Sequence, residues 1–516
     1  MPQETKNRSI TPLIAASLAI GFCSVGMEIV SSRMLAPFYG TSIFVWSNII
    51  AVILLSLSAG YWLGGLAADK RPDAGLLTHL SLAAGLIFLL APKVSPFLIQ
   101  GINKVVYNTH PGNPTFFISS FVSALILFGL PTVFLGMASP ILVKAYNLRN
   151  NRIGRSTGLI FAISTFGSIA GTFVPTFWLL PMLGTAKTTY VLAGILILIG
   201  LFGLTTKAFR QIILIAAAIG LVAVIPDPQA SAGSRKIIYE GESEYHHIEV
   251  AEDKTGNRYL LFNEGLSLES VYERNKVLTG GIYDYFNVLP YALADDSKEP
   301  KKVLVIGLAG ATIPRQMNYF FGDKLQIDAV EIDPKVVDIA REYFDLDQVK
   351  ANVIVADGRN FLEQPGKKYD LIIVDVFLNE MYIPWTFSTD EFWKLVSSRM
   401  NENGIVAMNV HSVSPDSLLV TSMTNTLAHV FGKAYKTSYK PPLIYSYMLI
   451  GGKDPQFNKM SVKPELESLR RDLANNLTEV EYSKDRPLLT DDWAPVEKML
   501  DGSIEYYRKL KLIETL

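Results

Sequence analysis

The sequence predicts a multi-pass α-helical membrane domain followed by a Rossmann-like α/β domain, with a small β region between them. Long apolar stretches fill the first part of the chain, whereas the charged residues, only 18% of the total, are concentrated after residue 235. From residue 302 onward, short apolar runs alternate with helix-like segments, which is typical of a mostly parallel sheet covered on both faces. We expect the domains at residues 1–228, 229–298 and 299–516.

Composition excludes some classes of protein. A net charge of −1 gives no argument for nucleic-acid binding. The single cysteine, Cys23, lies inside an apolar stretch, so we expect neither a disulfide framework nor a thiolate zinc site. The first apolar run is about as long as a full membrane span, which favours an anchor over a cleaved signal.

Seven stretches are apolar and long enough to cross a bilayer, which needs roughly 20 residues of helix. They cover residues 12–34, 44–66, 76–98, 116–138, 157–181, 186–205 and 210–226. Gly60 and Gly64, like Gly167 and Gly171, stand one turn apart, which predicts close helix packing. Glu28 lies within the first stretch, and both a buried pair and a transport role are open for it.

A linker and a small β region follow the apolar stretches. Residues 226–233 are rich in proline, alanine, serine and glycine, as linkers are. Tyr245–Ala251 and Arg258–Asn263 are predicted strands, and the turn-rich segment between them predicts a hairpin. We therefore expect a small antiparallel sheet ahead of the α/β domain.

The predicted strands of the α/β domain end in residues suited to a nucleoside. The strand VLVIG runs into a loop of small residues at Gly307, which permits close backbone approach but also occurs for packing reasons alone. Glu331 ends the second strand, 24 residues after Gly307, where a carboxylate can accept both ribose hydroxyls. Asp357 ends the third strand and suits an adenine amino group, and Asp375 ends the fourth.

A dinucleotide is a weaker interpretation of the same loop. Ala309 and Pro314 stand where glycines would help a pyrophosphate to bind. A nucleoside without phosphates therefore fits better, and Asp375 suits an amine or the surroundings of a sulfonium group.

The run VLVIGLAGATIPRQM…DAVEIDP…NVIVADGRNFL…YDLIIVDVF resembles the polyamine aminopropyltransferases, the spermidine and spermine synthases. The segments GMEIVSSRMLAPFYG, IPWTFST and LLTDDWAPVE are similar to their membrane-fused bacterial relatives. The resemblance implies an α/β domain of the S-adenosylmethionine-dependent transferase type. It also implies transfer of the aminopropyl group of decarboxylated S-adenosylmethionine to a polyamine such as putrescine, with release of methylthioadenosine.

By position, the resemblance assigns a catalytic carboxylate, which helps to take a proton from the attacking amine, to Asp375. The residues that it implies for binding the nucleoside are Gly307, Ala309, Gly310, Glu331, Asp357 and Gly358.

Two departures weaken the resemblance on the amine side. Soluble spermidine synthases have GGGDG where this chain reads Gly307-Leu-Ala-Gly-Ala, so the acidic loop residue is missing. Their second aspartate after the fourth strand is Leu378 here. The weaker candidates for contacts to an amine substrate are Tyr283, Asp284, Glu380 and Tyr382.

Other functions remain open from the sequence. The domain could use S-adenosylmethionine itself, as a methyltransferase or as a lyase, or it could regulate a transporter or sensor. We expect no metal, because no histidines have metal-ligand spacing. We expect an amine substrate and the lipid bilayer as partners and no nucleic acid, and the resemblance implies a homodimer.

The location of the soluble part is ambiguous. Basic residues gather before the first stretch and after the second, fourth and sixth, which predicts a cytoplasmic N-terminus and, with seven spans, an external soluble part. Adenosyl-sulfonium compounds are made in the cytoplasm, however. We therefore expect a bacterial inner-membrane protein whose soluble domain is cytoplasmic.

Overall fold

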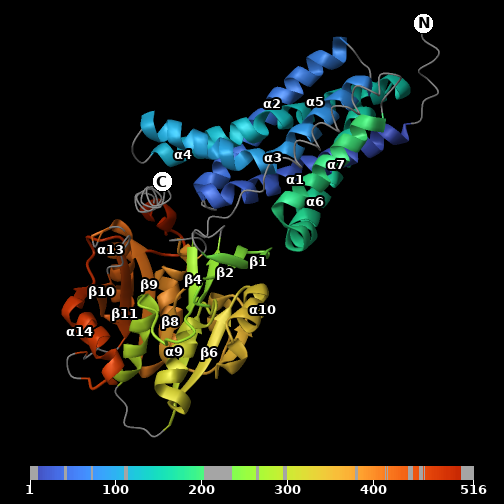
Figure 1. Cartoon of the computed structure of the whole chain (residues 1–516). Helices are drawn as coiled ribbons and strands as arrows, with labels where there is room; N and C mark the ends of the chain where they lie inside the picture. Colours follow the sequence, from blue (N-terminus) through green and yellow to red (C-terminus); the bar gives the residue numbers. More distant parts are fainter. Residues whose placement is uncertain are drawn as a thin grey trace. The chain divides into compact units, whose positions relative to one another are not determined.

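The computed structural model divides the chain into two compact units, Met1–Ala230 and Ser231–Leu516 (Figure 1). Each unit is considered by itself. The residues that the structure describes are 10–39, 43–70, 74–109, 114–202, 235–262, 267–293, 299–377, 382–412, 414, 416–439, 445–452, 457 and 460–500.

The first unit is helical throughout its described part. Its elements are α1 (Thr11–Tyr39), α2 (Ile43–Lys70), α3 (Ala74–Thr109), α4 (Pro114–Ala124), the π-helical η2 (Leu125–Gly129), α5 (Leu130–Asn150), α6 (Ile153–Val174), the π-helical η3 (Pro175–Leu179) and α7 (Leu180–Phe202). Among the described residues, five helical segments are long and apolar enough to cross a membrane. The fifth, Ile153–Leu201, is broken at Gly184, which has φ 78° and ψ 172°.

Six of the seven predicted stretches fall on these helices, and the seventh, 210–226, lies outside the described residues. The two glycine pairs lie where helices touch. A Cβ at Gly60 or Gly64 would meet the backbone of α5, and one at Gly167 or Gly171 would meet the backbone of α1. The close-packing prediction is therefore confirmed, since only glycine admits such an approach.

The second unit contains a mixed sheet of eight strands in the order β12-β10-β11-β9-β8-β5-β6-β7. The strands are β5 (Lys301–Ile306), β6 (Leu325–Glu331), β7 (Asn352–Val355), β8 (Tyr369–Val374), β9 (Met400–Ser412), β10 (Lys433–Tyr439), β11 (Tyr445–Gly452) and β12 (Thr478–Glu481). Strands β5 to β9 pair in parallel, whereas β10, β11 and β12 pair antiparallel. The Rossmann-like prediction is confirmed, with an antiparallel extension that was not predicted.

Helices cover both faces of this sheet, as the apolar runs of β5 and β8 predict. One face packs against the 3₁₀ segment η4 and helices α9, α10 and α14, and the other against α11, α12 and α13. The bounds are η4 (Ile282–Ala292), α9 (Thr312–Phe321), α10 (Pro334–Tyr343), α11 (Gly358–Glu363), α12 (Asp390–Ser398), α13 (Leu418–Phe431) and α14 (Glu467–Asn476).

A second, antiparallel sheet has the order β1-β2-β3-β4. Its strands are β1 (Lys236–Glu242), β2 (His247–Glu252), β3 (Arg258–Phe262) and β4 (Ser267–Tyr272). The predicted hairpin is β2 and β3, whereas β1 and β4 were not predicted. The sheet buries Val250 and Leu260 against Val336 and Phe344, so it packs against α10 and the residue that follows it (Figure 1).

Candidate functional site

The site lies where the strand order reverses. Strand β5 has β6 on one side and β8 on the other, and ligands in such sheets bind beyond the carboxyl ends of the strands at this point. Gly307 follows β5 and Asp375 follows β8, and the Asp375 amide donates to the Ile306 carbonyl at 2.9 Å. Gly307 has φ +93°, and a Cβ there would overlap the Asp375 carbonyl oxygen. The loop and the predicted catalytic strand are therefore in direct backbone contact.

The glycine loop turns through left-handed backbone. Ala309 has φ 46° and Ala311 has φ 63°, which is uncommon for residues with a side chain. The amides of Leu308 and Ala309 donate to Oε2 of Glu331 at 3.2 and 3.0 Å. The amide of Gly310 donates to Oγ of Ser270 at 2.8 Å. Neighbouring strands therefore hold the loop on two sides.

Glu331 is the anchor of this loop. Its side chain is 8% exposed, and its Oε1 accepts the Asp333 amide at 3.1 Å. Burial raises the pKa of the Glu331 carboxyl above its usual value. Because a carboxylate has about four acceptor sites, Glu331 keeps capacity for ribose hydroxyls while it orders the loop.

Asp357 begins α11 and accepts the Asn360 amide at 2.8 Å. A Cβ at Gly358 would overlap the Ile306 side chain, so this turn lies directly against β5. Next in the chain, Arg359 makes a bidentate ion pair with Asp491, at 2.9 Å for Nη1 and Oδ1. The segment LLTDDWAPVE is thus tied to the end of β7 by an ion pair that spacing along the chain did not indicate.

Asp375 is held by the neighbouring strand. Nδ2 of Asn409, near the end of β9, donates to Oδ1 of Asp375 at 3.0 Å. Asn409 is 2% exposed, and its Oδ1 has no partner among the described residues. Burial raises the pKa of Asp375 to about 6, although the Asn409 hydrogen bond opposes this shift. A carboxylate in this state can accept a proton near neutral pH.

An aromatic pair lies two residues beyond Asp375 and Asn409 in the chain. Phe377 stacks on His411 with ring centroids 4.7 Å apart. Burial lowers the pKa of His411 to about 4, so the ring is neutral at physiological pH, and its Nδ1 lies 2.9 Å from Oγ of Ser446.

The weaker amine-side candidates have different surroundings. Tyr283 lies near Asp375, but its hydroxyl donates to the carbonyls of Leu268 and Glu269 at 3.2 and 3.0 Å, and burial raises its pKa well above the usual value. The carboxylate of Asp284 accepts from two backbone amides, from the Thr279 hydroxyl and from the Gln316 amide, which is a structural role.

The other two candidates contribute less. Tyr382 is 4% exposed and belongs to the core on the α12 side. Glu380 lies outside the described residues. The charge of Asp375 contributes to the raised pKa of Tyr283.

Glu269, on β4, is a carboxylate that the sequence did not indicate. Burial, together with the charges of Asp375 and Glu331, raises its pKa to about 8. Its position in a short strand with mixed polar and apolar residues carries no signal, because only the packing of β4 on the loop brings it to the site.

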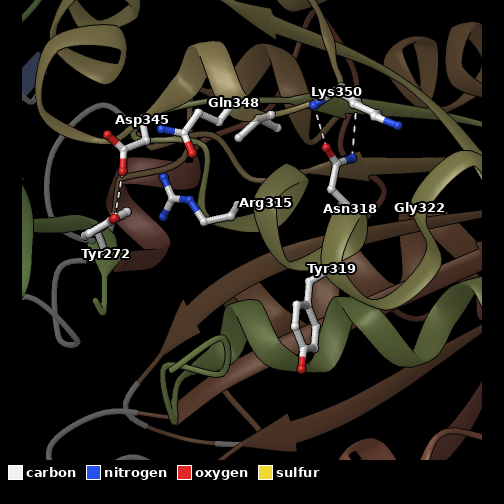
Figure 2. Close-up of a pocket in the computed structure, with 9 residues that line it drawn as sticks. Tyr272, Arg315, Asn318, Tyr319, Gly322, Asp345, Gln348 and Lys350 are labelled. Atoms are coloured by element: carbon white, nitrogen blue, oxygen red, sulfur yellow. Dashed lines mark hydrogen bonds between the residues drawn. The ribbon is translucent and has the colours of Figure 1, made fainter. Parts of the chain in front are cut away.

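A pocket of about 370 Å³ lies apart from this site and is lined by none of the predicted site residues (Figure 2). In it, Tyr272 donates to Oδ2 of Asp345 at 2.7 Å, and the Arg315 guanidinium lies 4.5 Å from the Tyr272 ring centroid. Arg315 also donates to the Gly310 carbonyl at 3.3 Å, so the pocket borders the rear of the glycine loop. Across the described part of the chain, no group of three histidine, cysteine or acidic residues is arranged to hold a metal.

Comparison with known proteins bears on the second unit in particular. Residues 291–458 match the spermine/spermidine synthase domain. A probable polyamine aminopropyl transferase of Bifidobacterium longum is 30% identical over 282 residues, 51% of this chain and 61% of the relative. Polyamine aminopropyltransferase 2 of Aquifex aeolicus is 22% identical over 477 residues, 88% of this chain and 90% of the relative. This second match is longer than Ser231–Leu516, so it extends into the apolar unit.

Among solved structures, a probable spermidine synthase from Corynebacterium glutamicum is similar, with 19% identity and a TM-score of 0.40. The similarity covers 50% of this chain and 97% of that protein. A spermidine synthase in complex with the transition-state analogue AdoDATO has 20% identity and a TM-score of 0.36. The similarity covers 48% of this chain and 82% of that protein.

Proposed function

We propose that this chain, whose residues 291–458 match the spermine/spermidine synthase domain, is a membrane-anchored aminopropyltransferase. It takes decarboxylated S-adenosylmethionine as donor and a polyamine such as putrescine as acceptor, and it releases methylthioadenosine. The observation that carries the proposal is the backbone contact of the glycine loop with Asp375, a half-buried carboxylate whose pKa desolvation raises to about 6.

The reaction requires alignment of the acceptor amine with the donor and removal of a proton from that amine. The neutral nitrogen of the acceptor attacks the methylene carbon bonded to the sulfonium, the C–S bond breaks, and its electron pair stays on sulfur in methylthioadenosine. The nitrogen then carries a surplus proton, which Asp375 accepts. Because the sulfonium is a good leaving group, positioning and general-base catalysis suffice.

The donor nucleoside lies, in this proposal, across the carboxyl ends of β5, β6 and β7. Gly307, Ala309 and Gly310 line the methionine-derived part, Glu331 accepts from the ribose hydroxyls, and Asp357 with Gly358 borders the adenine. The hydrogen bonds of Glu331 to the loop amides support this arrangement, since they order the loop before any ligand binds.

The first unit anchors the enzyme in the inner membrane of a bacterial cell, with the second unit in the cytoplasm, where the donor is made. Five apolar helical segments of sufficient length support membrane association. The N-terminal part of the Aquifex relative's alignment supports a shared architecture. A homodimer and the identity of the amine stay predictions.

The test is product analysis with the purified full-length protein. Decarboxylated S-adenosylmethionine is supplied with and without putrescine, and the products are separated by chromatography for the wild type, Asp375→Asn and the control Asp338→Asn, a surface carboxylate paired with Arg341. We expect an aminopropylated amine whose rate of formation falls about 10²- to 10⁴-fold in Asp375→Asn and is unchanged in the control.

Two results would contradict the proposal. Methylthioadenosine formed without an aminopropylated product would indicate a lyase. S-adenosylhomocysteine formed from S-adenosylmethionine would indicate a methyltransferase.

A further inference from the structure

Strand β4 contains a β-bulge at Glu269. In the pairing with β3, Leu260 lies opposite Ser270 and Leu261 lies opposite Leu268, so Glu269 has no partner residue. A bulge interrupts the alternation of side chains and re-aims the extra residue, and bulges are enriched next to active sites for this reason. The Glu269 side chain is therefore directed by the bulge rather than by the regular pleat of the strand.

Two neighbours hold this bulge in place. The Tyr283 hydroxyl donates to the carbonyls of Leu268 and Glu269, the residues at the bulge. The hydroxyl of Ser267 donates to Oε1 of Glu269. Tyr283 thus acts on the site through Glu269, by fixing the backbone that carries it.

The bulge lies against the glycine loop. Ser270, the next residue, accepts the Gly310 amide, and a Cβ at Gly310 would lie 2.7 Å from Cβ of Ser270. The space next to Gly310 is therefore filled by β4, and no side chain could extend from the loop there. Glu269 is the carboxylate that β4 brings to this part of the loop.

The charged groups that act on Glu269 would favour a cationic ligand beside it. Those that act on it come from Asp375 and Glu331, and both are negative. The unpartnered Oδ1 of buried Asn409, whose amide group contacts Asp375, adds a hydrogen-bond acceptor to the same region. Carboxylates whose charges act on one another favour a ligand with a positive charge, because its binding offsets their repulsion.

We propose that Glu269 binds the primary ammonium of the donor's aminopropyl group and selects the decarboxylated donor over S-adenosylmethionine. This inference rests on the proposed function. The donor is preferred over the acceptor as the source of this ammonium because β4 contacts the loop at Gly310, where the methionine-derived part lies. The extra α-carboxylate of S-adenosylmethionine would meet Glu269 and Asp375, and like charges repel.

The test measures binding by the full-length protein with two probes that differ at this group. Decarboxylated S-adenosylmethionine carries the aminopropyl ammonium, whereas methylthioadenosine lacks it. In Glu269→Gln, which keeps a hydrogen-bond acceptor for Ser267, we expect the Kd for the donor to rise about 10- to 100-fold. The Kd for methylthioadenosine should change less than about two-fold, which also establishes that the variant is folded.

Two further variants complete the design. Glu269→Asp keeps the charge and should recover part of the lost affinity for the donor. Glu273→Gln removes a nearby carboxylate that pairs with Lys276 instead, and it should bind both probes as the wild type does. The ratio of the Kd for S-adenosylmethionine to the Kd for its decarboxylated form should fall in Glu269→Gln only.

The outcomes separate this inference from the proposed function. Equal weakening of both probes in Glu269→Gln, or no weakening of either, would overturn the role of Glu269 while the transferase function stands. Unchanged donor binding with a raised KM for putrescine would move Glu269 to the acceptor and overturn the assignment. If the wild type bound neither probe, both proposals would fail.

Discussion

At the scale of single residues, the hydrogen bond of Asn409 to Asp375 is the clearest control on the proposed chemistry. Burial favours the neutral carboxyl, whereas the amide donor favours the carboxylate, and the balance raises the pKa of Asp375 to about 6. The carboxylate accepts a proton only above that pH. Burial and this hydrogen bond together therefore set the lower pH limit of the proposed activity.

The pH dependence follows with a definite sign. In the wild type, protonation of Asp375 should lower kcat/KM by about ten-fold per pH unit below pH 6, in addition to the decrease that protonation of the acceptor amine causes, because a protonated Asp375 cannot act as a base. In Asn409→Ala the hydrogen bond is lost, so the pKa of Asp375 should rise and the midpoint should move to higher pH. Initial rates between pH 5 and 8 test this, and the acceptor's own titration cancels in the comparison of the two proteins.

A control accompanies this profile. Circular dichroism over the same pH range should show that Asn409→Ala stays folded. An identical midpoint in the two proteins would contradict the role of Asn409.

At the scale of elements, the close contact of two strand ends makes Gly307 irreplaceable. Alanine at this position would need a left-handed backbone and would also drive its methyl group into the Asp375 carbonyl. We expect Gly307→Ala to abolish nucleoside binding, because the loop after β5 and the end of β8 would separate. Isothermal titration with methylthioadenosine measures this.

Gly432 offers a matched control for this substitution. It has φ +82°, but nothing lies within 4 Å of the position that a methyl group would take there. Gly432→Ala should therefore cost only the left-handed strain, about 1 kcal/mol, and should bind the nucleoside normally. Equal losses in the two variants would mean that strain alone, and not the contact with Asp375, matters at Gly307.

The ion pair of Arg359 with Asp491 links two elements that are distant in sequence. Arg359 follows the proposed adenine-binding turn, and Thr389 at the start of α12 also donates to Asp491, at 2.7 Å. Asp491→Ala should lower the free energy of unfolding by about 1–2 kcal/mol and weaken binding of the nucleoside, because α11 loses its support. Asp492→Ala, an exposed neighbour, should have neither effect in thermal melting and titration.

At the scale of the whole molecule, the number of crossings decides the side of the second unit. The segment Ile153–Leu201 is 49 residues long, more than one crossing needs, and the break at Gly184 divides it. Six crossings up to α7 would return the chain to the side of the N-terminus. The predicted stretch 210–226 lies outside the described residues.

A reporter tests this arrangement. We expect alkaline phosphatase fused after residue 235 to be inactive and green fluorescent protein at the same point to be fluorescent, as for a cytoplasmic segment. The converse pattern would place the second unit outside and would require the donor to reach it across the membrane.

The sequence alone was sufficient for the elements whose signal is local. Strands β5 and β8 contain runs of valine, isoleucine and leucine because both faces of the sheet are covered, and such runs are visible without a structure. The edge strand β12 and its neighbour β10 were missed, since TEVE and KAYKTSY carry charged and polar residues in place of an apolar run. Strand β4 was missed because its bulge breaks the period of two.

The same distinction holds for the candidate site. The glycine loop, Glu331, Asp357 and Asp375 could be predicted because parallel strands bring their carboxyl ends to one edge, a rule that holds for any sequence with this pattern. Glu269, Asn409 and the Arg359–Asp491 pair could not, because each reaches the site from an element whose place depends on packing between distant parts of the chain. By itself the sequence determined the two-part architecture and the residues at the carboxyl ends of the parallel strands, whereas the tertiary structure decided which side chains from other elements lie beside them.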